Sequence, residues 1–363
     1  MSNAVDTLAV DNLDTDTLSR YLEQHLAGFR GPLRAEKFSG GQSNPTFKLT
    51  AASGTYVLRR QPPGKLLKSA HAVDREYRVL AALKNTEVPV AEVYHLCEDR
   101  RIIGSMFYLM EFCDGHVYWG AALPEIDSAE RRAAMYDEMN RVLVALHSVD
   151  IDAVGLSDYG KPGNYFERQL GRWSSQYQAS ELQPIAAMSQ LIRWLDKNLP
   201  ADDGKVALTH GDYRLDNLMF SQDNRRIIAV LDWELSTLGH PYSDLAYQCM
   251  QLRLPSSNEK NTMSGLLGVN PAELGIPSEA EYVDAYCRRM GIDTIPNWSF
   301  YLAFSFFRLA AICQGVAKRA TEGNASNKAA DRVGAMVQPL AEMALEIIHN
   351  NNDAGDTHES NRL

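Results

Sequence analysis

The pattern of hydrophobic and polar positions changes near residue 113. Residues 14–27 begin with Asp and Thr and carry leucines at a helical spacing, which predicts a short helix. From residue 33 to residue 112, short β-prone runs alternate with Gly-containing turns, and one amphipathic helix interrupts them. The predicted strands are 35–39, 46–51, 55–60 and 106–112, and the predicted helix is 72–85.

Helical patterns dominate after residue 113. We expect helices at 128–148, about 165–198, 279–290, 298–320 and 327–350. Two β-prone runs, 205–210 and 226–233, interrupt the series. The last segment is polar and has no periodic apolar face, which predicts disorder.

These patterns predict an α+β fold with two lobes. A small β-rich N-lobe would span 33–112 and a large, mainly helical C-lobe 113–350, with a connector near Glu111 to Gly115. We expect an N-terminal helical extension over 1–32 and a disordered tail over 351–363.

Composition and charge narrow the class of protein. The net charge of −10 argues against a general nucleic-acid binder, because such proteins need a basic face. It leaves a phosphorylated ligand open, since a few local cations suffice. The acidity would suit a cationic substrate, but it would equally serve solubility.

Cysteine usage and hydropathy bear on the compartment. The five cysteines are scattered, and no two form a C-x-x-C pair, which indicates thiols in a reducing compartment. The N-terminus shows no basic region followed by an apolar core, so we expect a cytoplasmic protein. The most apolar stretch, 300–317, contains Arg308 and Gln314 and is short for a membrane span, which favours a core helix and no membrane partner.

Residues 208–217, "LTHGDYRLDN", gather polar groups that could carry chemistry. Phosphoryl transfer needs a carboxylate that orients or deprotonates the attacking hydroxyl, hard oxygen ligands for Mg²⁺, and a cation against the phosphate charge. Asp212 can be that carboxylate, and Asn217 with Asp232, at the end of an apolar run, can be the metal ligands. The alternative is a capped surface turn.

The pattern H-G-D-x-x-x-x-N, followed by an apolar strand and D-W-E, resembles the aminoglycoside phosphotransferase and choline kinase group. The resemblance runs from about Phe38 to about Tyr247. More narrowly, "GGQSNPTFKL", "YVLRRQPPG" and "VLDWELSTLGHPYSDLAY" look like the kinase-like domain fused to animal acyl-CoA dehydrogenases. It implies a protein-kinase-like bilobal fold, ATP and Mg²⁺ as cofactors, and transfer of the γ-phosphate to a hydroxyl of a small molecule.

The resemblance places a phosphate-binding loop in the first hairpin of the N-lobe. Gly40 and Gly41 would let the backbone approach a phosphate, and Ser43 and Asn44 would donate or cap. The loop departs from the G-x-G-x-x-G of protein kinases, and a plain hairpin turn would explain the same residues.

A cation on the third predicted strand should follow. In the kinase pattern V-A-I-K, a strand lysine contacts the phosphates, and Arg59 occupies that position here. Arg60 would face the other side of the strand. Arginine binds phosphate as a planar fork, whereas lysine is a point charge, so the geometry differs from the kinase pattern. Glu76 of the predicted helix would pair with the cation, with Asp74 the second choice; exposed strand-end and helix charges are the alternatives.

The remaining assignments also rest on the resemblance. Backbone groups of Glu111, Phe112 and Cys113 would hydrogen-bond the adenine edge. Asp244 would tie loops together through backbone N–H groups, and His210 would brace the loop that carries Asp212.

Three further histidines were assigned no chemistry. We expect His25, His71 and His147 to be surface or helix-face residues.

The spacing after Asp232 bears on the acceptor. Asp244 follows twelve residues later, and "STLGHPY" between them suggests a tight turn, so the long segment on which protein kinases dock peptides is missing. We therefore expect a small-molecule hydroxyl acceptor. An aminoglycoside, a choline-like amino alcohol, a sugar and a hydroxyacyl thioester stay open, with a slight preference for the thioester. The rival hypothesis is a catalytically silent nucleotide-binding interaction module, and the oligomeric state is open.

Overall fold

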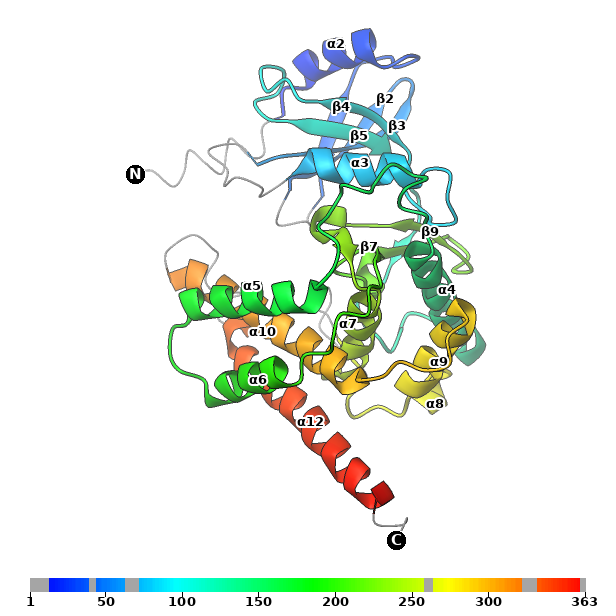
Figure 1. Cartoon of the computed structure of the whole chain (residues 1–363). Helices are drawn as coiled ribbons and strands as arrows, with labels where there is room; N and C mark the ends of the chain where they lie inside the picture. The colour runs from blue at the N-terminus through cyan, green and yellow to red at the C-terminus, as the bar shows by residue number, and fades with distance from the viewer. Residues whose placement is uncertain (1–12, 39–43, 63–71, 258–263, 322–331, 360–363) are drawn as a thin grey trace. The chain divides into compact units, whose positions relative to one another are not determined.

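The structure, a computed structural model, describes residues 13–38, 44–62, 72–257, 264–321 and 332–359, the last nine by their backbone (Figure 1). The chain forms two compact units. The first comprises Met1–Tyr118, Val149–Ser157 and Asp216–Ser236, and the second comprises Trp119–Ser148, Asp158–Leu215 and Thr237–Leu363. The segments 33–112 and 113–350 do not coincide with these units, because short pieces of the later chain join the first unit.

The first unit is built on a five-stranded antiparallel sheet in the order β1-β2-β3-β5-β4. Two helices accompany it, α2 (Thr15–His25) and α3 (Val73–Leu83). The strands are β1 (Arg34–Lys37), β2 (Thr46–Ala51), β3 (Gly54–Arg60), β4 (Val93–Cys97) and β5 (Phe107–Glu111). Of these, β4 was not predicted.

The two helices lie on opposite faces of the sheet. Neighbouring side chains of a strand point to opposite faces of the sheet, so the side chains of Leu58 and Arg59 lie on opposite faces. Leu58 joins the apolar cluster that includes Leu18 and Leu22 of α2. Arg59 points to the other face, where it reaches Glu76 of α3. Figure 1 shows α2 above the sheet and α3 below it. Helix α2, which lies within the predicted N-terminal extension, therefore contributes to the core of this unit.

A second, three-stranded sheet in the first unit has the order β6-β8-β9. Its strands are β6 (His116–Val117), β8 (Leu218–Phe220) and β9 (Ile227–Val230), and the 3₁₀ turn η2 (Trp233–Leu235) follows. Leu218 stands opposite Val230 in the antiparallel β8–β9 pair. The residue before β8 and the residues after β9 therefore lie at the same end of the hairpin.

The second unit is mainly helical. Its helices are α4 (Ala129–His147), α5 (Tyr165–Ser180), α6 (Ala186–Lys197), α7 (Tyr242–Arg253), α8 (Pro271–Leu274), α9 (Glu279–Met290), α10 (Trp298–Thr321) and α12 (Val337–Glu359). Strands β7 (Ala207–Thr209) and β10 (Thr237–Gly239) form an antiparallel pair. Helix α10 packs against α5, α6, α7 and α12.

The apolar stretch 300–317 lies within helix α10. In the part of the chain that the structure describes, it is the one helix long and apolar enough to cross a membrane. However, 78% of its most apolar 18-residue stretch is buried inside the protein. This burial agrees with the expectation that the apolar stretch forms a core helix.

The structure corrects the prediction after Asp232. The segment expected to be a tight turn contains strand β10, whose Gly239 pairs with Ala207. A side chain at Gly239 would collide with Tyr165 at 2.7 Å and with Thr209 at 2.8 Å, so this close approach requires glycine. Helix α7, which follows, was not predicted.

Two predicted boundaries also differ. The single helix expected over about 165–198 is broken into α5 and α6, and Pro184 lies between them. Proline lacks the backbone N–H and disfavours helical geometry in the residue before it. The backbone of α12 continues to Glu359, into the segment expected to be disordered, because extending an existing helix avoids the cost of nucleation.

Candidate functional site

In the first unit, Arg59 stands among three carboxylates. Its Nε lies 2.7 Å from Glu76 Oε2, its Nη2 lies 2.7 Å from Asp232 Oδ1, and Glu234 is 3.9 Å away. The pair that the sequence predicted, Arg59 with Glu76 instead of Asp74, is therefore present. Burial disfavours the Arg59 cation, but Glu76 and Asp232 outweigh that effect and raise its pKa.

Glu76 is fixed by more than its ion pair. It is almost fully buried and accepts hydrogen bonds from Asn44 Nδ2 at 2.8 Å and from Tyr108 Oη at 3.1 Å. Burial raises the pKa of Glu76 to about 7, because Arg59 offsets only part of the cost of desolvating the carboxylate. Asn44, expected in the phosphate-binding loop, is itself buried and donates to Glu76. Tyr108 was not singled out from the sequence.

Arg60 lies on the other face of β3. It is buried, its guanidinium lies 5.4 Å from the Phe47 ring, and Nη1 donates to the Ile103 carbonyl at 3.4 Å. The alternation predicted from the strand therefore holds, and Arg59 is the arginine on the side of Asp232.

Asn217 and Asp232 flank the β8–β9 hairpin at one end. The Leu231 N–H donates to the Asn217 carbonyl at 2.8 Å, which ties the residue before β8 to the residue before Asp232. Asp232 itself has φ 62° and ψ 66°, a left-handed conformation that costs energy in a residue other than glycine. The indole N–H of Trp233 donates to the Val230 carbonyl at 2.9 Å and anchors this turn.

The donor set at this hairpin end fits Mg²⁺. A carboxylate and an amide oxygen are hard ligands, and Mg²⁺ typically takes one or two protein groups together with phosphate and water. In the described ranges there is no group of three or more His, Cys, Asp or Glu side chains that could hold a metal.

In the second unit, a buried carboxylate braces the loop that carries Asp212. Asp244 accepts hydrogen bonds from the backbone N–H of His210 at 2.6 Å and of Gly211 at 2.8 Å. The Asp212 N–H donates to His210 Nδ1 at 3.2 Å. Gly211 has φ 82°, which favours glycine. The bracing roles expected for Asp244 and His210 are thus both seen.

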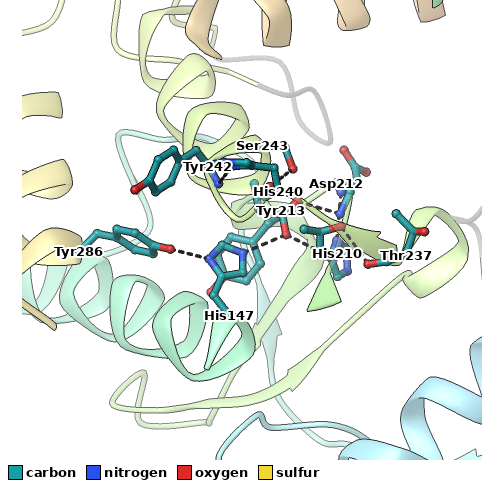
Figure 2. A network of polar contacts seen from close by, with 12 residues as sticks. His147, His210, Asp212, Tyr213, Thr237, His240, Tyr242, Ser243 and Tyr286 are labelled. Carbon is teal, nitrogen blue, oxygen red and sulfur yellow. Dashed lines mark hydrogen bonds and ion pairs between the residues drawn. The ribbon is translucent and has the colours of Figure 1, made fainter. Parts of the chain in front are cut away.

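His147 corrects an expectation. Its ring is buried, with Nδ1 2.8 Å from the Tyr286 hydroxyl and Nε2 3.3 Å from Asp244 (Figure 2). A carboxylate can only accept, so Nε2 donates to Asp244. It was expected at the surface or on a helix face; it does belong to helix α4, but it is buried and bonded to residues from distant parts of the chain. His25 is exposed, and His71 lies outside the described residues.

The Asp212 carboxylate has a cation and a phenol as neighbours. Arg214 Nε lies 3.2 Å from Asp212 Oδ1. Burial raises the pKa of Tyr247, and the charge of Asp212 and a hydrogen bond to it act in the same direction. A carboxylate held by a cation and a phenol is oriented, as a group that orients a hydroxyl must be.

The structure describes only some of the other residues predicted to bind the nucleotide. Gly40, Gly41 and Ser43 lie outside the described residues. At the end of β5, the Glu111 N–H donates to the Glu92 carbonyl at 2.8 Å, so this donor is already used within the sheet. The Phe112 ring lies 4.6 Å from Lys48 Nζ. Cys113 is half-buried, and burial raises the pKa of its thiol to about 11.

All five cysteines are free, and four of them are buried.

Two hollows in the second unit do not include Asp212. One of about 270 Å³ lies at the start of α5, and one of about 430 Å³ lies beside α12. The candidate chemistry is therefore argued from the braced loop and not from these hollows.

Residues 34–293 match the phosphotransferase enzyme family. The chain belongs to this family. It is 47% identical over 330 residues to acyl-CoA dehydrogenase family member 10 of Mus musculus, covering 91% of this chain and 30% of the relative. It is 43% identical to family member 11 of the same organism, covering 95% of this chain and 44% of the relative. The chain thus spans less than half the length of these curated relatives.

Solved structures confirm the fold class. A crystal structure of a candidate aminoglycoside phosphotransferase from Ralstonia eutropha superposes with a TM-score of 0.83 at 48% identity, covering 93% of this chain and 99% of the other. Choline kinase of Cryptosporidium parvum gives 0.66 at 12%, covering 94% and 97%. Aminoglycoside phosphotransferase APH(4)-Ia, solved with ADP and hygromycin B, gives 0.58 at 15%, covering 91% and 98%. The family and its kinase-like fold follow from these matches.

Proposed function

We propose that this phosphotransferase family member is an ATP- and Mg²⁺-dependent kinase of a small-molecule hydroxyl. The observation that carries the proposal is the Asp212 loop, in which a buried Asp244 fixes the backbone and Arg214 and Tyr247 orient the Asp212 carboxylate. A carboxylate held in a fixed position is the group that this reaction requires of the protein.

The residues of the chain would share the work as follows. Asp212 orients the acceptor hydroxyl and takes its proton as the oxygen attacks the γ-phosphorus and the bond to ADP breaks. Arg59, held by Glu76, offsets phosphate charge. Asn217 and Asp232 would hold Mg²⁺, which when bound neutralises charge on the phosphates.

The proposal also concerns which class of small molecule accepts the phosphate. The likeness to acyl-CoA dehydrogenase family members supports a hydroxyacyl thioester. The likeness to choline kinase and to a phosphotransferase solved with hygromycin B keeps an amino alcohol and an aminoglycoside open. A screen of hydroxylated compounds, with ADP formation as the readout, would separate them.

The decisive variant is Asp212→Asn, which preserves shape and removes the base. Its contribution lies in the transition state, so kcat should fall by about 10²- to 10⁴-fold with ATP affinity little changed. Asp223→Asn, in the exposed turn between β8 and β9, is the control and should keep full turnover. Full turnover by Asp212→Asn would show that the loop is only a braced turn. ATP binding without transfer to any acceptor in wild type would favour a nucleotide-binding interaction module.

A further inference from the structure

Helix α10 carries a buried charge that the fold does not neutralise. Arg308 is only 7% exposed, in the most apolar helix of the second unit. Among the described residues it makes no ion pair and no hydrogen bond, whereas Gln314 of the same helix donates to the Ser180 carbonyl at 2.8 Å. A buried guanidinium has five N–H donors, and leaving them unsatisfied is costly.

The neighbours of Arg308 are aromatic. Its Cζ lies 5.2 Å from the Tyr247 ring of α7 and 5.7 Å from the Trp173 ring of α5. Such stacking stabilises a cation, but the ring faces offer no acceptor for the N–H groups. The buried indole N–H of Trp173 also has no partner among the described residues. A guanidinium without an ion pair and an unpartnered indole N–H beside it describe a place for an anion.

The position of this cluster connects it to the candidate chemistry. Tyr247 contacts Arg308 with its ring, and its hydroxyl is hydrogen-bonded to Asp212. An anion at Arg308 would therefore lie one side chain away from the carboxylate that orients the acceptor hydroxyl. A single small molecule could reach both groups if its hydroxyl and its anionic group were separated by a short chain.

We propose that Arg308, with Trp173 and Tyr247, forms a subsite for an oxyanion of the phosphate acceptor. This inference rests on the proposed function and narrows the acceptor to molecules that carry a hydroxyl and, a short chain away from it, a carboxylate or a phosphate. A choline-like cation or a neutral sugar would leave the guanidinium without a counter-ion. Acceptors of those two classes should therefore be poor.

Stability of the ligand-free protein separates a binding role from a structural one. Arg308→Met keeps the length of the side chain and removes the charge. If the charge awaits a ligand, its loss leaves the melting temperature unchanged or raises it, because replacing a buried unpaired charge by an apolar group removes a desolvation cost. A clear drop in melting temperature would show that stacking on the two rings is its purpose, and it would overturn the proposal.

Binding is then measured without turnover. The probes are inorganic phosphate, coenzyme A, and ω-hydroxycarboxylates of two to six carbons with their neutral diols, each titrated calorimetrically into the full chain. Wild type should bind a probe of at least one anionic class and no diol. Arg308→Met should weaken that binding by about 10- to 100-fold, the size expected when a charge-assisted contact is lost. The carboxylate and phosphate arms identify which oxyanion the subsite takes.

Matched variants keep the test independent of folding. Arg172 lies 5.5 Å from the same Trp173 ring but is exposed, so Arg172→Met removes a cation from the same indole without changing the subsite. It should bind the probes like wild type. Trp173→Phe keeps a ring and removes the indole N–H, and it should weaken anion binding by a smaller factor. Equal effects of Arg172→Met and Arg308→Met would mean only general charge attraction.

The proposed function and the subsite can fail separately. Transfer to a neutral or cationic acceptor, with no anion effect at Arg308, would keep the kinase and reject the subsite. Anion binding that depends on Arg308, in a protein that transfers no phosphate, would keep the subsite and reject the kinase.

Discussion

Asp244 offers a test of the site that needs neither the acceptor nor the nucleotide. Its buried carboxylate accepts the backbone N–H groups of His210 and Gly211 and the ring of His147, so both oxygens are in use. Asp244→Ala would leave these donors buried without an acceptor. Breaking one partner of a buried charged network typically costs about 3–5 kcal/mol. We expect a loss of about that size in the free energy of unfolding.

Asp244→Asn refines the magnitude. Asparagine keeps one acceptor oxygen and turns the other into an NH₂ group, which must then face a donor. The variant therefore loses at least one hydrogen bond to a charged group, worth about 1.5–3 kcal/mol. The exposed Asp223→Asn should change stability by less than about 0.5 kcal/mol and serves as the control.

The pH dependence follows from the same contacts. Burial alone would raise the pKa of Asp244, but the hydrogen bond and charge of His147, followed by His210 and the Gly211 N–H, lower it below its usual value. A carboxyl whose pKa is lower in the folded state stabilises the fold above its unfolded pKa, near 3.9. That stabilisation is lost as the pH falls through the folded value. The gap between wild type and Asp244→Asn should thus be full at pH 7 and narrow below about pH 4.

The assay should be local as well as global. Chemical denaturation gives the free energy, but a chain with two compact units need not unfold in one step. Hydrogen exchange of a peptide that covers residues 207–215 reports directly on the His210 and Gly211 amides. Unchanged exchange there, together with a stability loss under about 0.5 kcal/mol, would refute the view that Asp244 holds the loop.

The remaining predictions concern the first unit. Asp232→Ala should weaken Mg·ATP binding far more than metal-free ATP binding in calorimetry, and equal losses would remove Asp232 from the metal site. Arg59→Ala should weaken ATP binding by roughly 10- to 100-fold, as expected for a lost phosphate contact. Arg60→Ala should instead lower the melting temperature with ATP affinity unchanged, since Arg60 contacts Phe47 and the Ile103 carbonyl; the reverse pattern would reject this division of roles.

Periodic apolar patterns predicted the elements that bury one face and missed those that do not. Strand β3 alternates between Leu58 on one face and Arg59 on the other, so both its place and the partner of Arg59 could be predicted. Helix α7 is buried along nearly its whole length, so it shows no polar stripe to reveal its period. Strands β8 and β10 have three residues each, too few to display an alternation.

The site residues that belong to a short motif could be predicted from the sequence. The residues that join the site through contacts between distant segments could not. Asp212, Asn217 and Asp232 stand out by type and spacing. Asn44 and Tyr108 were not predicted as partners of Glu76, because their positions on β-prone segments say nothing about which helix residue they meet. The burial of His147 was not predicted for the same reason, since Tyr286 and Asp244 lie far along the chain.

Arg308 shows the limit of pattern reasoning most clearly. The sequence alone marks it as an isolated charge in an apolar helix, and the usual expectation is a carboxylate partner elsewhere in the core. Only the structure shows that the helices which meet α10 supply Trp173 and Tyr247 there and no acid among the described residues. We infer that the charge is offset when an anion binds beside it. The hydrogen bond from Tyr247 to the Asp212 carboxylate makes the phosphate acceptor the natural candidate.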